Sequence, residues 1–233
     1  MVKAHLKRLA APRTWKIPRK KSTWITRPLP GRSRFELGMP ISVILKEVIN
    51  LTKTTREVRY LIYNKQLLVN HKEIKSHKHL VGLFDVISFP SINKHYRLVL
   101  STKGYLTCKE IDEKEASYKI IKLINKTYLK GGKLQYNFND GTNFIVKEDK
   151  LNVGDGILFD LKNKKQKNEI KLEENTLVIF IAGAHMGHIG KVKSLSKGSR
   201  LFVNVENSTK EVKKDFIIPI GKEKPLITVN VEE

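Results

Sequence analysis

The chain has 233 residues, of which 40% are hydrophobic, and 45 Lys and Arg against 23 Asp and Glu give a formal net charge of +22. One cysteine, Cys108, excludes an internal disulfide and a multi-cysteine zinc site, and no stretch approaches the ~18 apolar residues of a membrane span. The length favours one to three domains, and residues 1–20 have no apolar stretch of signal-peptide length. We therefore expect a cytoplasmic protein that forms no homo-oligomer, avoids membranes and binds a polyanion.

Residues 1–38 are predicted to be a basic N-terminal arm. The first 34 residues contain 11 Lys or Arg and not one Asp or Glu, with four prolines among them. Such a segment forms neither one long helix nor a core of its own, so we expect it to need a polyanion to order it. Nucleic acid is favoured because the arm has no continuous apolar face for a membrane. Trp15 and Trp24 are suited either to stacking on unpaired bases or to anchoring the arm to the body, and both alternatives stay open.

Residues 39–95 predict a small unit of two helices followed by short strands. Apolar residues recur at helical spacing over residues 41–49. Thr54, with Glu57 three residues later, is a capping-box pattern that begins a second helix. A strand over Val86–Phe89 closes the unit before a proline.

The second of these helices presents Arg56, Arg59 and Lys65 on its outward face. The strands over residues 66–74 turn at Asn70-His71, where Asn-Gly is usual, so the type of turn is left open. Two adjacent helices followed by a hairpin resemble the αL RNA-binding motif, in which helix N-termini and outward arginines present donors to an RNA backbone. The alternative is that the arginines are only the polar face of an amphipathic helix.

Residues 96–174 predict a mixed, mostly β central domain. Glu113–Ile124 is expected to be a helix, because it has an acidic start and a basic later half. The lysine-rich residues 162–167 are expected to form a solvated loop or a hairpin tip. The remaining pattern is of short strands separated by glycine-containing turns, over Arg97–Leu100, Tyr105–Cys108, Leu134–Phe138, Asn143–Val146 and Gly156–Asp160.

Residues 175–233 predict five short strands in ~45 residues, which is typical of a small barrel. The expected strands are Leu177–Ala182, Gly190–Leu195, Leu201–Val205, Glu211–Lys213 and Phe216–Pro219. Between the first two lies a glycine-rich turn, residues 183–192, that resembles the KOW motif of SH3-like barrels in ribosomal proteins and elongation factors.

The sequence offers no catalytic constellation. Gly190-Lys191 is followed by Val192 instead of Ser or Thr, which excludes a Walker phosphate loop. His185 and His188 have no Cys or acidic residue nearby to complete a zinc site. No Ser-His-Asp, Cys-His or paired-carboxylate pattern stands out, so we predict no catalytic residue, no metal and no cofactor.

The whole chain resembles one family, the archaeal and eukaryotic "four-e" protein of the small ribosomal subunit, most closely in its archaeal form. The resemblance implies an α+β, multidomain fold with an arm, an αL domain, a central domain and a KOW barrel. It also implies a structural role in which the chain binds small-subunit ribosomal RNA beside neighbouring ribosomal proteins. The stretches that carry it are His5–Pro12, Val81–Ile87, Glu115–Lys119, Gly183–Gly190 and Ile220–Lys222.

Two other functions fit parts of the sequence less well. An RNA-modifying enzyme with an αL targeting domain needs a catalytic domain between Tyr96 and Asn175, where no aspartate or thiol has a recognisable catalytic setting. A KOW-type transcription elongation factor is expected to have a polymerase-binding domain, which the arm and the αL pattern do not fit. The candidate RNA-binding residues are Lys3, His5, Lys7, Arg8, Arg13, Trp15, Lys16, Arg19, Lys20, Lys21, Trp24, Arg27, Arg32, Arg34, Arg56, Arg59, Lys65, His185, His188 and Lys191.

Overall fold

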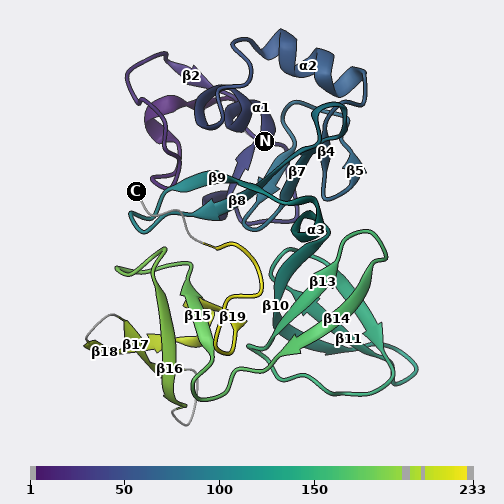
Figure 1. The fold of residues 1–233 in the computed structure, drawn as a ribbon, viewed down its shortest axis with the longest axis vertical. Helices are drawn as coiled ribbons and strands as arrows, with labels where there is room; N and C mark the ends of the chain where they lie inside the picture. Colours follow the sequence, from purple (N-terminus) through teal and green to yellow (C-terminus); the bar gives the residue numbers. More distant parts are fainter. Residues whose placement is uncertain (1–3, 196–199, 206–207, 230–233) are drawn as a thin grey trace. The chain divides into compact units, whose positions relative to one another are not determined.

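The computed structural model describes residues 4–195, 200–205 and 208–229 (Figure 1). They form two compact units, one within residues 1–117 and one within residues 118–233. Several antiparallel sheets and a few short helices make up the described structure, which confirms the expected α+β class. Among the described residues, no helix is long and apolar enough to cross a membrane.

Residues 4–37 of the N-terminal segment form short elements with a defined structure, and the need for a polyanion stays a prediction. Two of these elements, β1 and β2, pair antiparallel, with Lys7 opposite Trp24. The elements are β1 (Leu6–Lys7), η1 (Arg8–Ala10), β2 (Trp24–Ile25) and η2 (Phe35–Leu37).

Trp15 anchors this segment to the body of the first unit. Its side chain is only 1% exposed, and its indole N–H donates to the carbonyl of Gly38 at 2.9 Å. The neighbouring Thr14 carbonyl accepts from the N–H of Leu106 at 2.7 Å. The apolar area of a buried indole supplies enough stabilisation to hold a segment that has no core of its own. Trp15 therefore anchors the arm to the body, which is one of the two roles considered for the tryptophans.

Two helices follow, as the sequence predicts. The first begins as α1 (Ile41–Val43) and continues as η3 (Ile44–Val48), a π-type segment closed by the N–H of Ile49 donating to the carbonyl of Ile44. Strand β3 (Gly38–Pro40), just before α1, pairs with β6 (Leu80–Gly82). The second helix is α2 (Thr55–Tyr63).

The capping box at the start of α2 is confirmed. The Thr54 hydroxyl oxygen accepts from the N–H of Glu57 at 3.3 Å, and the Glu57 carboxylate accepts from the N–H of Lys53 at 2.8 Å. Val58 is fully buried, whereas Arg56 and its neighbours on the outward face are exposed. This reciprocal bonding satisfies N–H groups that would otherwise lack partners at the helix start.

A five-stranded antiparallel sheet in the order β5-β4-β7-β8-β9 completes the first unit. Asn70 and His71 have φ values of 52° and 57°, so the turn between β4 and β5 is of the type I′ kind without a glycine. The Asn70 side chain stabilises it by donating to Asp85 at 2.8 Å and accepting from the N–H of Val86 at 2.9 Å. The strands are β4 (Leu68–Val69), β5 (Lys72–Glu73), β7 (Val86–Phe89), β8 (Lys94–Leu100) and β9 (Leu106–Ile111), with η4 (Pro90–Ile92) before β8.

Two strands that we expected to open the central domain belong to this sheet instead. β8 pairs with β7, Val86 lying opposite Arg97, and β9 pairs with β8. Arg97 on β8 is fully buried, and its guanidinium donates to the side-chain carboxylate of Glu115 and to the backbone carbonyl of the same residue, within the first unit. A sequence pattern of short strands cannot tell which sheet a strand joins.

The predicted helix over Glu113–Ile124 is wrong. Only α3 (Glu113–Ala116) is helical, and the chain then forms β10 (Tyr118–Tyr128), the central strand of a sheet. Ile120 and Leu123 are completely buried, and β10 pairs with one strand over its first half and with another over its second. Tertiary pairing on both edges outweighed the charge pattern that favoured a helix.

The second unit contains two five-stranded antiparallel sheets (Figure 1). The first has the order β12-β11-β10-β13-β14, and the second has the order β18-β17-β16-β15-β19. Residues 161–164 form the hairpin tip before β14, as expected for part of the lysine-rich stretch. The further strands are β11 (Leu134–Phe138), β12 (Asn143–Val146), β13 (Gly156–Asp160), β14 (Lys165–Ile170), β15 (Leu177–Phe180), β16 (Ile189–Leu195), β17 (Arg200–Val205), β18 (Ser208–Lys213) and β19 (Ile217–Gly221), with η5 (Lys214–Phe216) before β19.

All five strands predicted after residue 175 are present. Buried and exposed side chains alternate along β16 and β17, whereas every residue of β15 and β19 is buried, and their inward side chains pack into one core. This core consists of Leu172, Val178, Phe180, Val192, Leu201, Val203, Val205 and Ile217.

Candidate nucleic-acid interface

The structure divides the basic residues of the N-terminal segment into exposed and internally bonded groups. Lys3 lies outside the described residues. Arg27 is half-buried and donates to the carbonyl of His5 at 3.3 Å. Arg8, Arg19 and Trp15 have internal partners, which leaves the others at the surface. The exposed candidates are His5, Lys7, Arg13, Lys16, Lys20, Lys21, Trp24, Arg32 and Arg34.

Arg8 is buried and binds a carboxylate. Its guanidinium forms an ion pair with Glu47 at 2.9 Å and donates to the carbonyl of Pro18 at 3.0 Å. Burial alone would raise the pKa of Glu47, but the hydrogen bond and charge of Arg8 outweigh it and the pKa lies below its usual range. Lys21 adds a weaker contact to the same carboxylate at 3.7 Å. This arginine therefore fixes the segment on the first helix.

Arg19 also has a structural position. Its two terminal nitrogens donate to the carbonyls of Ala11 and Pro12 at 2.6 and 2.7 Å. The hydrogen bonds cross the proline-rich turn from one side to the other. A charged donor on backbone carbonyls makes such a turn rigid, because each bond is stronger than one between neutral groups.

The exposed tryptophan lies beside cationic and aromatic neighbours. Trp24 is 56% exposed, its ring centroid lies 5.6 Å from that of His5, and Lys7 is its partner across the β1–β2 pair. An accessible ring next to a lysine is the arrangement that stacks on a base while the ammonium contacts a phosphate. Of the two tryptophans, only Trp24 presents such a ring.

One face of α2 combines cations and aromatic rings. Arg56, Arg59, Tyr60 and Tyr63 occupy positions i, i+3, i+4 and i+7, which lie on one side of a helix. The two tyrosines are 64% and 87% exposed. Our sequence reading identified the arginines and missed the tyrosines, although the same spacing of exposed aromatic residues was available to find them.

Two neighbouring groups adjust the charge on this face. Lys65, just after α2, forms an exposed ion pair with Glu73 at 3.1 Å. Arg59 donates to a ring nitrogen of His77 at 3.5 Å. Burial, and then the charge of Arg59, lowers the pKa of His77, so its ring stays neutral and accepts that hydrogen bond. Arg56 has no ion-pair partner among the described residues, so it is the more available of the two arginines.

The glycine-rich turn in the second unit is closed by backbone hydrogen bonds. Gly183 and Gly187 have φ values of 89° and 90°, which favour glycine. The N–H of Gly187 donates to the carbonyl of Phe180 at 2.8 Å. A Cβ on Gly190 would lie 2.6 Å from the side chain of Val203, so β16 and β17 approach closely only because this residue has no side chain.

The histidines of this turn are half-buried. His185 Nε2 lies 2.6 Å from the ammonium of Lys210, so the ring accepts from it. The His185 and His188 rings meet edge to face at 6.1 Å. Lys191 is exposed on β16. Among the described residues no group of three His, Cys, Asp or Glu is placed to hold a metal.

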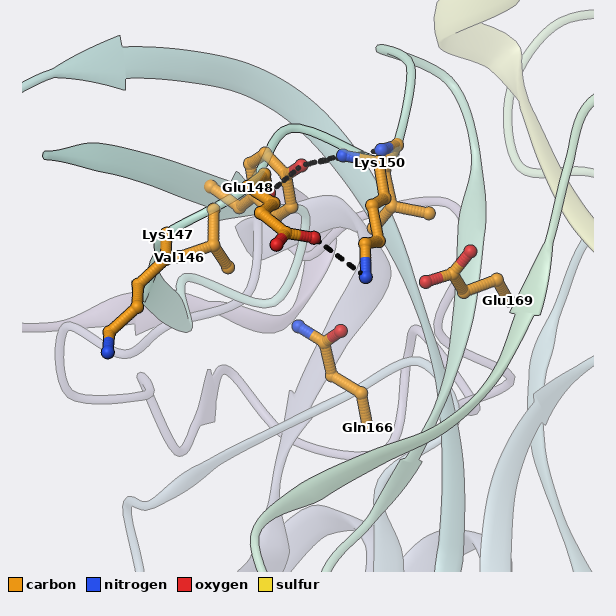
Figure 2. A pocket seen from close by; sticks show the side chains of 8 residues that line it. Val146, Lys147, Glu148, Lys150, Gln166 and Glu169 are labelled. Carbon is orange, nitrogen blue, oxygen red and sulfur yellow. Dashed lines mark hydrogen bonds and ion pairs between the residues drawn. The ribbon is translucent and has the colours of Figure 1, made fainter.

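A pocket of about 260 Å³ lies in the first sheet of the second unit, between the loop after β12 and β14 (Figure 2). Two of its charged groups, Glu148 and Lys150, form an ion pair at 2.9 Å. The Tyr136 hydroxyl donates to Asp149 at 2.8 Å and accepts from the N–H of Lys150 at 2.9 Å, which fixes the loop. The lining residues are Tyr136, Val146, Lys147, Glu148, Lys150, Leu151, Gln166 and Glu169.

Comparison with known proteins identifies a consistent group of relatives. Residues 2–31 match the RS4NT domain, and residues 92–166 match the ribosomal family S4e. The chain is 39% identical over 225 residues to small ribosomal subunit protein eS4 of Nanoarchaeum equitans, covering 94% of this chain and 96% of that protein. It is 36% identical over 239 residues to the eS4 protein of Archaeoglobus fulgidus, covering 99% of this chain and 100% of that protein.

A crystal structure with a similar fold is known. The crystal structure of the 30S ribosomal protein S4e from Thermoplasma acidophilum superposes with a TM-score of 0.69 at 24% identity, covering 80% of this chain and 96% of that one. At this identity the likeness concerns the fold alone.

Proposed function

Since the chain belongs to the S4e family of ribosomal proteins, we propose that it is a structural component of the small ribosomal subunit that binds ribosomal RNA. Its relatives are named as small-subunit proteins and match along nearly the whole chain. The proposal includes contacts with neighbouring small-subunit proteins and a cytoplasmic location, and it involves no catalysis.

The observation that carries RNA binding is uncompensated positive charge on an ordered segment. Five exposed cations in the N-terminal segment make no ion pair among the described residues, whereas Arg8 and Arg19 have internal partners. When such cations bind the phosphates of a nucleic acid, the counterions condensed on the nucleic acid are released, and this release favours binding. The five cations are Lys7, Arg13, Lys20, Arg32 and Arg34.

Order in this segment changes the mechanism that we expect. A segment held by Trp15 and Arg8 already has its shape before RNA binds, so little conformational entropy is lost at binding. Its cations then contact phosphates at fixed spacing, and Trp24 is available to stack on an unpaired base. Several such surfaces on one chain bind one folded RNA tightly through effective concentration.

We further propose an αL-type unit over residues 39–95, inside a body that also includes β8 and β9. Support comes from the capped helix α2, the type I′ hairpin and the outward face of Arg56 and Arg59. We propose that the central domain begins after this body, over residues 118–174, and that residues 175–233 form a KOW-type barrel, supported by the glycine turn and the five-stranded sheet.

Binding of the full chain to transcribed small-subunit ribosomal RNA tests the proposal. Each phosphate contact contributes about 0.7 to 0.9 to the slope of log K against log salt. Replacing the five unpaired cations by glutamine should therefore reduce the slope by about 4. A control chain should have Lys94, Lys126, Lys150, Arg200 and Lys222 replaced by glutamine, because each of these is paired with a carboxylate. Equal losses in both chains would contradict the proposal.

A further inference from the structure

A second acid-free basic stretch lies in the middle of the chain. Residues 116–139 contain five lysines and no Asp or Glu, and they form β10, a turn and β11. Three of the lysines have internal partners. Lys119 pairs with Asp140 at 3.2 Å, Lys122 donates to backbone carbonyls including that of Ile217, and Lys126 pairs with an aspartate at 2.6 Å.

The two remaining lysines, Lys130 and Lys133, lie at the tip of the hairpin. Both are exposed, and neither forms an ion pair within the part of the chain that the structure describes. Charge is therefore neutralised along the hairpin and left uncompensated at its end. On a protein with a net charge of +22, the positive charges at the tip are repelled by those on the rest of the surface. A polyanion bound at the tip would relieve this repulsion.

The backbone of the tip is open to close approach. Gly131 and Gly132 have φ values of 82° and 69°, and a Cβ on either would meet no atom within 4 Å. The turn is closed by the N–H of Leu129 donating to the carbonyl of Lys133 at 2.8 Å. The space around the glycines lets a ligand reach the backbone of the tip directly.

An exposed aromatic ring stands beside the lysines. Tyr128 is 75% exposed, although Leu134, its partner across the strands, is only 5% exposed. On the other face of the hairpin, uncharged groups form a hydrogen-bonded row. Asn137 donates to Thr127 at 2.8 Å and accepts from Gln135 at 2.6 Å. Amide and hydroxyl groups of this kind are suited to hydrogen-bond the ribose 2′-hydroxyls that distinguish RNA from DNA.

The base of the hairpin is rigid. Lys126 and the Tyr136 hydroxyl both bind the side chain of Asp149, which ties the loop after β12 to β10 and β11. The ion pair between Glu148 and Lys150 closes the same loop, as Figure 2 shows. A rigid base holds the tip at a fixed position, so its contacts are made without a further loss of entropy.

We propose that the β10–β11 tip, residues Tyr128–Lys133, is a separate RNA-binding site on the second unit. Lys130 and Lys133 bind phosphates, the glycines let the RNA backbone approach, and Tyr128 stacks on an unpaired base. The inference rests on the proposed function, because it needs RNA as the partner. This site adds Tyr128, Lys130 and Lys133 to the candidate RNA-binding residues predicted from the sequence.

Lysine acetylation footprinting tests the site directly. The full chain, free and bound to transcribed small-subunit ribosomal RNA, is treated with an acetylating reagent, and each lysine is quantified by mass spectrometry. We expect protection of Lys130 and Lys133 in the complex. If the chain binds RNA and protects lysines elsewhere but not these two, the tip proposal is overturned while the proposed function stands. No binding at all overturns both, and protection that appears only after other ribosomal proteins are added makes the tip a protein contact.

Binding measurements on variants give a second test. K130Q/K133Q should weaken binding about tenfold and lower the salt slope by about 1.6. K94Q/K222Q removes the same charge from lysines paired with Glu110 and Glu173, and it should change affinity less than twofold. Y128A should bind the RNA with about tenfold lower affinity, whereas Y128F should retain the affinity because phenylalanine keeps the stacking ring. Equal effects of the two lysine pairs would overturn the proposal.

Discussion

Replacing Trp15 by alanine tests whether the N-terminal segment is held on the body before RNA binds. The indole is 1% exposed and its N–H donates to the carbonyl of Gly38. Truncating a fully buried tryptophan to alanine costs about 3 to 5 kcal/mol of unfolding free energy, part of it from the unpaired carbonyl. The matched control is W24A, because Trp24 is 56% exposed and its loss should cost less than about 1 kcal/mol.

Urea unfolding followed by circular dichroism measures the free energy, and hydrogen exchange locates the effect. The N–H of Leu106 donates to the carbonyl of Thr14 in the segment, whereas the N–H of Leu98 donates to Asp85 inside the body. In W15A we expect exchange at Leu106 to accelerate more than exchange at Leu98. A loss below about 1 kcal/mol with unchanged exchange at Leu106, or an equal loss in W24A, would refute the reasoning.

Three further predictions concern other parts of the chain. The lowered pKa of Glu47 means that its pair with Arg8 stabilises the fold above the unfolded pKa of about 4.3 and that this contribution is lost as the pH falls below it. E47Q should therefore be about 3 kcal/mol less stable than wild type at pH 7, and this difference should shrink as the pH falls through the lowered pKa of Glu47; a difference that does not vary with pH would contradict this. Y60A/Y63A should weaken ribosomal RNA binding about tenfold while Y60F/Y63F does not, measured by filter binding, and equal losses would rule out stacking. G190A should lower unfolding free energy by about 1 to 3 kcal/mol, because the new Cβ collides with β17, and unchanged thermal unfolding would count against the close approach.

Local signals predicted local structure well. The spacing of Thr54 and Glu57 located the start of α2, because the capping bonds involve only neighbouring residues. Short runs of strand-forming residues located the five strands after residue 175 for the same reason. The type I′ turn at Asn70-His71 was harder, since the side chain of Asn70 is held by Asp85, which is distant in sequence.

Long-range contacts explain what the sequence could not predict. Nothing in the local sequence distinguishes Trp15 from Trp24, yet one is buried and the other exposed, because only Trp15 reaches Gly38. Ile120 lies in a strand because it pairs with Leu158 of β13, a distant partner, although its own neighbours favoured a helix. The role of Arg8 depended on Glu47, a partner 39 positions away.

Sedimentation of cell lysate tests the central proposal most directly. The chain is followed by an antibody through a sucrose gradient, before and after a high-salt wash. If it is a structural component held by many phosphate contacts on ordered surfaces, it should remain in small subunits at one copy each. Recovery only in the free pool, or with RNA polymerase, would contradict the account.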